Sequence, residues 1–396
     1  MAQKILIIPS WYPTEKNELR GSFFKEQALL LNKNGFDVKL LFAVEEEVGF
    51  FKYLSKLVGS FLKKRNDLST NVLKQEPEAY SFNTCRYKKR SVKFKITKNK
   101  KRYEKAFKEL TQNWKPELIH AQCTANAGIY ASHLSNTFSI HYVIIEHQVF
   151  LLNHYKKRIQ KEIVSALENA SKVGAVSYHQ QRCILMNNIS CDPVVIWNLL
   201  DESKFTLPKN DSNSKFTIVT ITYQHPIKDT LTFFKSLGES NKISDGDFEV
   251  VIIGNSAFKK GSKASSDLFK TMAKEHNVLD KCTFYPKLNR TEINTQLQQA
   301  NVFISTSIAE TYGIAVREAM LCGTPVIATK SGGIEDSIST ETGIKVNLKD
   351  YKAIAQNILK IQNKDIVFNP QKTRDFVIRQ SGRKAFIKKM TSFYQT

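Results

Sequence analysis

The chain has 396 residues, and its 59 Lys and Arg residues outnumber 37 Asp and Glu residues, for a formal net charge of +22 at pH 7. This length favours two domains, because single hydrophobic cores rarely extend beyond about 250–300 residues. With 41% hydrophobic and 11% aromatic residues the chain can bury enough apolar surface to fold, which excludes a disordered basic tail.

The sequence predicts a soluble, cytoplasmic protein. No apolar run approaches the roughly 20 residues that span a bilayer, and the run at 4–8 is too short for a signal peptide and ends at Pro9. The six cysteines are scattered without a Cys-x-x-Cys pair. The spacing therefore predicts neither a disulfide framework nor a structural zinc site, and it fits a reducing compartment.

The first half of the chain alternates short apolar runs with helix-length segments. A helix is expected from Ser22 to about Asn34, with Ser22 as its cap and Gly35 at its end. Strands are expected at residues 4–8, 38–44, 117–121, 142–146, 173–177 and 194–197. The alternation predicts a parallel sheet and a Rossmann-like domain over residues 1–200.

The positive charge of the first half is concentrated in residues 51–115, which carry 19 basic and 5 acidic residues. Residues 50–65 place apolar side chains on one helical face and lysines on another. This pattern predicts an interfacial helix, with an anionic membrane surface as the partner of residues 50–105. The alternative is a surface helix packed on the protein's own core. We do not expect nucleic-acid binding, since no zinc finger, RNP-type strand or heptad adjoins the block.

After a polar linker at residues 201–215, the same alternation restarts and predicts a second α/β domain over residues 216–370. Expected strands are 216–221, 248–253, 282–285, 302–305 and 325–328, and expected helices are near 228–238, 265–276, 291–300 and 313–322. The basic segment 371–396 is expected to be helical and to cross back to the first domain. Ligands of such folds bind at the carboxyl ends of the strands.

The most informative segment is residues 305–328. Glu310 lies in a loop after a strand, and Glu318 lies in the following helix, which begins near Gly313 and Ile314. Free N–H groups and the positive end of the dipole make a helix start suitable for a diphosphate. Glu318 can accept hydrogen bonds from a vicinal diol such as ribose, and Glu310 can reach sugar hydroxyls. Such a glutamate pair is often a solvated helix face, but here it lies between an apolar strand and a Gly-Thr-Pro turn.

Glu310 to Ile327 resembles the E-x7-E and EAMxxGxPVI signature of the retaining glycosyltransferases of family 4. Lys4 to Leu40 resembles the N-terminal acceptor-side segment of those members that build bacterial surface polysaccharides. The resemblance continues in order over nearly the whole chain, apart from the basic block. The other matching strings are Ile8–Pro13, Arg20–Gln27, Ile119–Gln122, Ile145–His147, Val176–Ser177, Ile196–Asp201, Pro226–Asp229 and Ser331–Asp336. The resemblance implies the GT-B fold, two Rossmann-like domains that face a central cleft.

The resemblance implies a nucleotide-sugar donor, bound mainly by the second domain, and neither a cofactor nor a metal. It assigns Lys228 to the donor diphosphate, where the leaving group needs charge neutralisation. Gly21 and Ser22 would face that diphosphate, and the base would contact the backbone near Lys287 and Leu288. The donor-binding residues that it assigns are Gly21, Ser22, Lys228, Lys287, Leu288, Tyr312, Gly313, Ile314 and Glu318.

For the chemistry, the resemblance implies front-face displacement with retention, in which the leaving phosphate takes the acceptor proton. Glu310 would orient the sugar and stabilise developing positive charge. Gln122 stands where the family has the second histidine of an HAH string. Any acid-base role would therefore fall to His120 or His147, although each could equally be a core residue.

Two further details bear on the donor. Tyr223 stands where many family members have an arginine, so the diphosphate has one cation fewer unless Arg290 or Lys287 replaces it. Residues 245–247 spell Asp-Gly-Asp and resemble a metal motif, but a turn is the better interpretation.

Together these observations predict a retaining glycosyltransferase that moves a hexose-type sugar to a lipid-linked or surface-glycan acceptor, as a peripheral protein on the inner face of the cell membrane. The alternatives are a nucleotide-sugar epimerase of the same fold and a non-catalytic sugar-binding protein.

Overall fold

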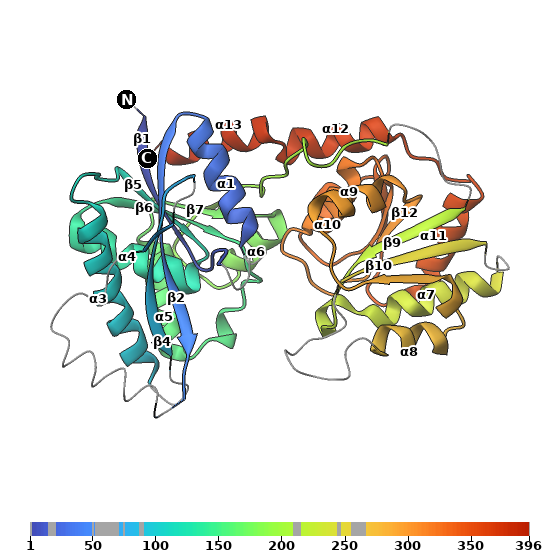
Figure 1. Cartoon of the computed structure of the whole chain (residues 1–396), viewed down its shortest axis with the longest axis horizontal. Coiled ribbons are helices and arrows are strands. Elements are labelled where there is room, and N and C mark those ends of the chain that lie inside the picture. Colours follow the sequence, from blue (N-terminus) through green and yellow to red (C-terminus); the bar gives the residue numbers. More distant parts are fainter. Residues whose placement is uncertain are drawn as a thin grey trace. The chain divides into compact units, whose positions relative to one another are not determined.

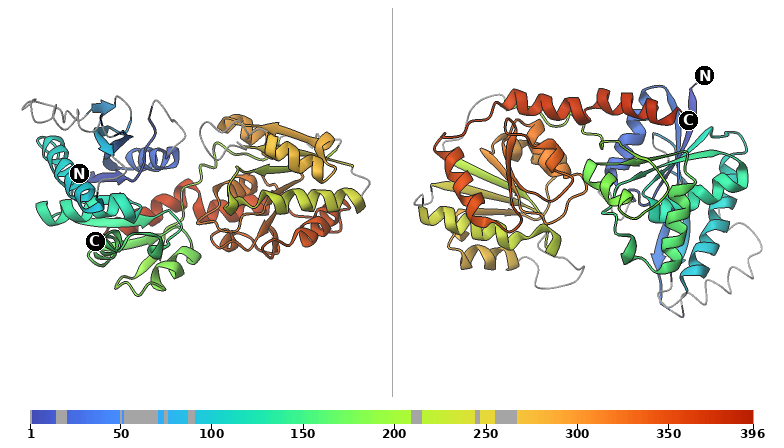
Figure 2. Two further views of the ribbon diagram at one scale, coloured as in Figure 1. Left: turned by 90° about the horizontal axis from the view of Figure 1, so that it is seen from below. Right: turned by 180° about the vertical axis from the view of Figure 1, so that it is seen from behind.

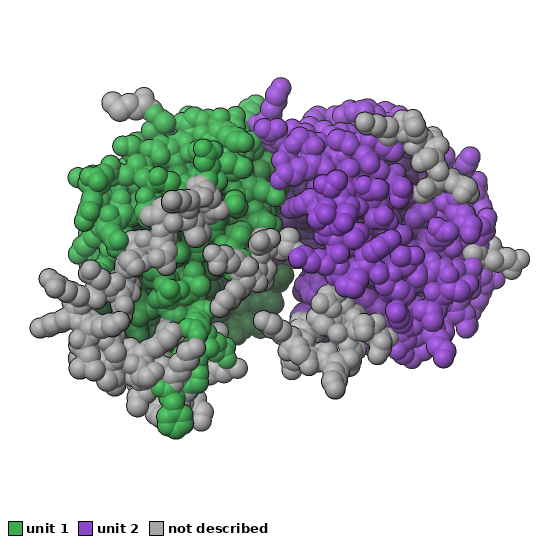
Figure 3. Space-filling model, viewed as in Figure 1, with its two compact units in different colours: residues 1–176, 180–199, 387–396 green, residues 177–179, 200–386 purple. Residues whose placement is uncertain are grey.

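The computed structural model describes residues 2–14, 21–49, 51, 71–73, 76–86, 91–208, 215–243, 247–254 and 267–395. Most of the predicted interfacial helix, part of the predicted linker and most of the Asp-Gly-Asp string lie outside the described residues. The chain divides into two compact units, which Figure 3 colours separately. Unit 1 comprises residues 1–176, 180–199 and 387–396, and unit 2 comprises residues 177–179 and 200–386.

Unit 1 is built on an eight-stranded sheet of the described residues, in the order β3-β4-β2-β1-β5-β6-β7-β8. All neighbouring strands are parallel except β3, which runs antiparallel to β4. The strands are β1 (Gln3–Pro9), β2 (Phe36–Glu47), β3 (Asn71–Leu73), β4 (Ala79–Arg86), β5 (Leu118–Gln122), β6 (His141–Glu146), β7 (Lys172–Ala175) and β8 (Pro193–Val195). The helices are α1 (Ser22–Lys33), α3 (Val92–Leu110), α4 (Ile129–Phe138), α5 (Lys157–Glu168) and α6 (Tyr178–Leu185), which begins in unit 2.

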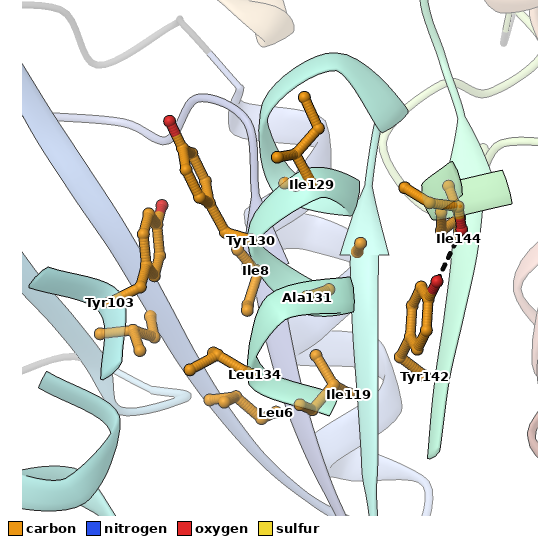
Figure 4. Close-up of a cluster of buried hydrophobic side chains, with 14 of the residues drawn as sticks. Leu6, Ile8, Tyr103, Ile119, Ile129, Tyr130, Ala131, Leu134, Tyr142 and Ile144 are labelled. Atoms are coloured by element: carbon orange, nitrogen blue, oxygen red, sulfur yellow. Dashed lines mark hydrogen bonds between the residues drawn. The ribbon is translucent and has the colours of Figure 1, made fainter. Parts of the chain in front are cut away.

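The two faces of the central strands in unit 1 have different surroundings. Leu6 and Ile8 of β1, with Ile119 of β5, point into the hydrophobic cluster that packs against α3 and α4 (Figure 4). In that cluster the rings of Tyr103 and Tyr130 stack with centroids 4.5 Å apart. Because side chains alternate along a strand, His120 and Gln122 of β5 point to the opposite face.

Helix α3 explains part of the basic block, where the sequence analysis predicted no helix. Ser91 caps its start by accepting a hydrogen bond from Phe94 N, at 3.2 Å. Ile96, Tyr103 and Phe107 are buried in the core of unit 1, and the lysines lie between these positions. Lys95 pairs with Glu45 at 2.9 Å and Lys100 with Glu162 at 2.8 Å, both from other elements, and Lys108 pairs with Glu104 within the helix at 2.9 Å. The core therefore anchors this basic segment, and distant glutamates offset part of its charge.

Unit 2 has a six-stranded parallel sheet in the order β11-β10-β9-β12-β13-β14. Helices cover both faces of the sheet (Figure 2). The strands are β9 (Phe216–Ile221), β10 (Phe248–Ile253), β11 (Cys282–Tyr285), β12 (Val302–Ser305), β13 (Val326–Thr329) and β14 (Gly343–Val346). The helices are α7 (Thr230–Ile243), α8 (Asp267–Glu275), α9 (Arg290–Gln298), α10 (Ile314–Leu321), α11 (Tyr351–Gln362), α12 (Pro370–Ser381) and the start of α13 (Arg383–Tyr394), which ends in unit 1.

The C-terminal segment is helical, as the sequence predicted, and consists of α12 followed by α13 (Figure 1). Residues 387–396, at the end of α13, belong to unit 1. There Tyr394 is buried, and its hydroxyl lies 2.8 Å from His120 Nδ1. The prediction that the last helix returns to the first domain is thus confirmed, and both units have the predicted Rossmann-like sheets.

Candidate functional site

The Glu310 loop connects β12 to α10 and is bound to a second loop that contains Gly332 and Gly333. Glu310 N donates to Ser331 O at 2.8 Å, and Gly333 N donates to Glu310 O at 2.8 Å. A Cβ atom on Gly333 would lie 1.9 Å from Thr311 O, so only glycine allows this approach. The backbone of Glu310 is therefore held in place on both sides.

The carboxylate of Glu310 is paired with Lys228. Lys228 Nζ lies 2.5 Å from Glu310 Oε1, and Ser307 Oγ donates to the same oxygen at 2.8 Å. Lys228 ends a turn that follows β9, in which His225 Nδ1 accepts a hydrogen bond from Ile227 N at 3.1 Å. Both side chains of the ion pair are largely buried, with about one-sixth of their surface exposed (18% and 17%). The structure thus brings together two residues that the sequence assigned to one donor site.

Gly313 forms the start of α10 with a backbone φ of +73°. This conformation strains L residues, and a Cβ atom there would lie 1.9 Å from Ile334 Cγ2. The helix starts at Ile314, which is half-buried, so the first N–H groups are near the surface. Tyr312, in contrast, is buried, and burial raises the pKa of its hydroxyl to about 12. Of these predicted donor residues, Gly313 and Ile314 therefore offer backbone groups, while the buried Tyr312 ring contacts the Arg317 guanidinium.

Glu318 forms an ion pair with Arg290, and its carboxylate side chain is only 7% exposed. Arg290 is the first residue of α9, whose start is fixed by a reciprocal pair of hydrogen bonds between Asn289 and Glu292. Lys287 is exposed and Leu288 is half-buried, both in the loop just before that helix. Arg290, a candidate for an extra cation at the diphosphate, has its guanidinium paired with Glu318 in the structure.

Tyr223 occupies the position where the resemblance led us to look for an arginine. Its ring lies under the Lys228 ammonium group, with 5.3 Å between Nζ and the ring centroid. Nearly half of the Tyr223 surface is exposed. A cation–π contact of this kind stabilises the lysine charge without adding a second cation.

In unit 1, Gly21 forms the N-cap of α1, with φ at +79°. A Cβ atom on Gly21 would lie 2.8 Å from Trp11 O, so this position is also restricted to glycine. The prediction that Ser22 caps the helix is wrong: Ser22 is the first helical residue, and no side chain makes a cap hydrogen bond. The left-handed conformation of Gly21 places it at the cap in place of serine.

His120 and His147 are both buried, and burial lowers the pKa of each to about 3. His120 Nε2 has no hydrogen-bond partner among the described residues, while its Nδ1 faces the Tyr394 hydroxyl. His147 lies against two aromatic rings, with centroids 4.9 Å from Phe24 and 5.6 Å from Phe23. At neutral pH both imidazoles are uncharged, so each can donate or accept a hydrogen bond but has no positive charge.

Gln122 belongs to a chain of buried amides. Its Nε2 donates to Gln27 Oε1 at 3.1 Å, and Gln27 Nε2 donates to Asn198 Oδ1 at 3.2 Å. The glutamine that replaces a family histidine is thus part of a hydrogen-bonded network with α1. Asn198 also contributes to the environment of His147.

Glu146 organises the loops at the ends of β5 and β6. Its carboxylate accepts hydrogen bonds from Thr124 N at 2.8 Å, His147 N at 2.9 Å and Gln148 N at 2.8 Å. Cys123, just before Thr124, has a φ of +74°. These bonds fix the backbone of His147, so Glu146 has a supporting role at this candidate site.

Arg317 is the residue near the site that the sequence analysis missed. It lies in the first turn of α10 and is fully buried, with its guanidinium 3.8 Å from the centroid of the Tyr312 ring. The signal in the sequence was one arginine among the apolar residues of residues 314–321.

Part of the chain is similar in sequence to known proteins. Residues 201–379 match the family described as "Glycosyl transferases group 1". The chain is 31% identical over 123 residues to a D-inositol 3-phosphate glycosyltransferase of Paenarthrobacter aurescens, an alignment that covers 31% of this chain and 29% of that protein. The chain thus spans under a third of the length of that curated relative.

Solved structures show the fold over the whole chain. Sucrose-phosphate synthase from Thermosynechococcus elongatus superposes with a TM-score of 0.74 and 18% identity, covering 99% of this chain and 98% of that one. Anabaena HepE, solved in complex with UDP and glucose, superposes with a TM-score of 0.72 and 14% identity, covering 100% of both chains. The predicted fold class is confirmed: the chain has the GT-B type of fold, with two Rossmann-like units.

The described residues contain no group of three or more His, Cys, Asp or Glu residues arranged to hold a metal ion. None of the helices within the described ranges is both long enough and apolar enough to traverse a bilayer.

Proposed function

We propose that the chain is a retaining glycosyltransferase that transfers a hexose-type sugar from a nucleotide-diphosphate donor to a lipid-linked or surface-glycan acceptor. The observation that carries the proposal is the Lys228–Glu310 pair within the segment that matches the group 1 glycosyl transferases. Lys228 and Glu310 come from loops that follow β9 and β12, neighbouring strands of one parallel sheet. Ligand sites of such sheets lie at this edge.

The donor half of the proposal rests on the anion-binding chemistry of unit 2. The backbone at Gly313 and Ile314 supplies N–H donors at the positive end of α10, and Lys228 supplies a cation. When the glycosidic bond to the diphosphate breaks, negative charge grows on the leaving group, and fixed positive groups stabilise that charge. The fold relative HepE was solved with UDP-glucose, which supports a nucleotide sugar as donor class.

Retention of the anomeric configuration is proposed from the contacts that the Glu310 carboxylate makes. Its carboxylate is held by Lys228 and Ser307, which suits a group that orients a sugar and offsets positive charge. In a front-face displacement the acceptor oxygen forms its bond on the side from which the diphosphate leaves, and the leaving phosphate oxygen takes the acceptor proton. Neutral His120 and His147 would then act through hydrogen bonds, and no metal is needed.

For the acceptor we propose a glycan on a lipid carrier, approached from an anionic membrane surface on the inner side of the cell membrane. The described support is the outward side of α3, where Lys93, Phe94, Lys101 and Lys105 are exposed. Lysines attract anionic headgroups, and an exposed phenylalanine can insert among them.

Sedimentation with vesicles that contain about 30% anionic lipid tests the membrane proposal, and the vesicles should pull down the full chain at low salt. A chain that stays in solution with these vesicles at every salt concentration would contradict the membrane proposal.

The donor proposal is tested by a thermal-shift screen against a panel of nucleotide sugars, because a ligand that binds only the folded state raises the melting temperature. One or a few donors sharing a base should stabilise the wild type. The epimerase alternative predicts that the stabilising donor is isomerised or hydrolysed without an acceptor. A transferase instead yields a glycosylated product only when acceptor is present.

A further inference from the structure

Arg317 is a buried cation, and both its burial and its position in the helix are unfavourable for a positive charge. It is fully buried, while its neighbours Val316 and Met320 on the same helix are buried apolar residues. Removing a guanidinium from water costs free energy that only good contacts return. It also lies in the first turn of α10, where the helix dipole repels positive charge. An apolar side chain at this position would avoid the desolvation free energy of a buried charge. The positive charge of Arg317 is therefore expected to have a function.

The contacts of Arg317 connect the parts of the Glu310 site. Its Nη2 donates to Gly333 O at 3.1 Å, and its Nε lies 3.5 Å from Gln380 Oε1. The guanidinium stacks on the Tyr312 ring at 3.8 Å from the centroid. Because Gly333 N binds Glu310 O, the arginine holds the same loop that holds Glu310. Arg317 therefore joins the start of α10 to both loops of the site.

The charge of Arg317 lies close to the start of α10. A Cβ atom built on Gly313 would be 3.8 Å from Arg317 Nη1. Burial lowers the pKa of Arg317, while the nearby Tyr312, Asp336 and Glu310 raise it, and an arginine stays protonated at neutral pH. A charge surrounded by protein acts over a longer range than one in water. A permanent positive charge, that of Arg317, thus lies next to the start of α10.

Resting on the proposed function, we propose that Arg317 is a positioning residue of the donor site whose buried charge strengthens binding of the donor diphosphate at the start of α10. It orders Gly313 and the Glu310 loop through Tyr312 and Gly333, and it adds positive potential where the diphosphate charge collects. This role differs from simple packing, because the Arg317 charge strengthens binding of the diphosphate and leaves binding of the nucleoside unaffected.

The test compares the affinity for a nucleoside diphosphate with the affinity for its nucleoside, in the full chain. The wild type is titrated with UDP, ADP and GDP by calorimetry, and the diphosphate that binds is then paired with its nucleoside. R317M keeps an unbranched side chain and removes the charge, while R317K keeps the charge and loses the planar contacts. R374M is the matched control, since Arg374 donates to Leu321 O at the other end of α10.

R317M should weaken the diphosphate about tenfold and change the nucleoside less than twofold, a difference of about 1.4 kcal/mol. R317K should recover most of this preference, and R374M should keep all of it. Equal weakening of both ligands by R317M, or an unchanged diphosphate affinity, would overturn the proposal. Should R317M not fold, R317K decides, because it keeps the charge. If R317K binds the diphosphate no more tightly than the nucleoside, the role of the charge is contradicted. A wild type that binds none of the three diphosphates would instead contradict the proposed function.

Discussion

Lys228 and Glu310 form an ion pair between two loops of unit 2, with 2.5 Å from Nζ to Oε1. The two residues are 82 positions apart in the chain, and backbone hydrogen bonds fix both loops, among them Ile308 N to Ile227 O at 2.7 Å. Each residue neutralises the charge of the other. A donor diphosphate would share the lysine, which leaves Glu310 free to orient the sugar.

Replacing Lys228 by methionine should therefore affect turnover more than folding. We expect kcat/KM for the donor to fall by about 10²–10³, the loss typical of removing one group that stabilises transition-state charge. Nucleotide release in the presence of acceptor measures this effect. The control is K242M, because Lys242 is a mostly exposed lysine at the end of α7. If kcat/KM is unchanged in K228M, Lys228 does not stabilise the charge of the leaving diphosphate.

Glu318 should recognise a vicinal diol. The wild type is expected to bind a ribonucleoside diphosphate about tenfold more tightly than the 2′-deoxy form, as for one hydrogen bond to a charged group. E318Q should lose most of this preference and leave Arg290 without its carboxylate partner. Calorimetric titration of both nucleotides measures the ratio. If E318Q discriminates as well as the wild type, Glu318 has a purely structural role.

The glycine at the start of α10 should be indispensable. G313A places a Cβ atom in a left-handed conformation and 1.9 Å from Ile334 Cγ2, so the helix start must shift. We expect a loss of about 2–3 kcal/mol in stability, or a displaced helix start that no longer binds nucleotide. G35A is the control, since Gly35 has a φ of +92° but nothing within 4 Å of the added atom. Urea unfolding of both variants decides the matter, and equal losses would show that strain alone is responsible.

The buried histidines should make the stability of the chain depend on pH. In the folded state the pKa of His120 and His147 is about 3, below the ordinary value of 6.5, because burial penalises the charged form. Between these values the unfolded chain binds more protons than the folded chain. Stability is therefore complete above pH 6.5 and falls as the pH drops toward 3, by about 1.4 kcal/mol per pH unit for each histidine.

Denaturant unfolding from pH 7 to pH 4.5 tests this expectation. H120Q and H147Q cannot titrate in this window, so each should flatten the dependence by about 1.4 kcal/mol per pH unit. A wild-type slope in H120Q and H147Q would mean that these imidazoles are charged in the folded chain.

Much of the fold could be predicted from the pattern of residues. The apolar runs gave the correct places of β1, β2, β9, β10 and β12, because buried parallel strands are almost continuous apolar stretches. Helix α3 was missed, since lysines separate its core residues Ile96, Tyr103 and Phe107 and hide their spacing. Strand β4 has a mixed composition, and its pairing with β2 and β3 defines it as a strand.

The site residues came from one loop-helix segment and from the resemblance, and sequence could not show their partners. Glu318 with Arg290 and Lys228 with Glu310 are pairs between distant segments that only the fold brings together. Arg317 was hidden because burial, not residue type, makes it unusual. The role of Ser22 was misjudged because a cap was expected from the side chain, whereas the backbone of Gly21 decides that position.

The measurement that tests the central claim most directly is transfer of a labelled sugar. The full chain is incubated with the nucleotide sugar that stabilises it and with a lipid extract as acceptor, and products are separated by chromatography and identified by mass spectrometry. The account predicts a glycosylated lipid that forms only with acceptor, keeps the anomeric configuration of the donor, and disappears in K228M. Donor that is hydrolysed or isomerised equally without acceptor, or product of inverted configuration, would contradict it.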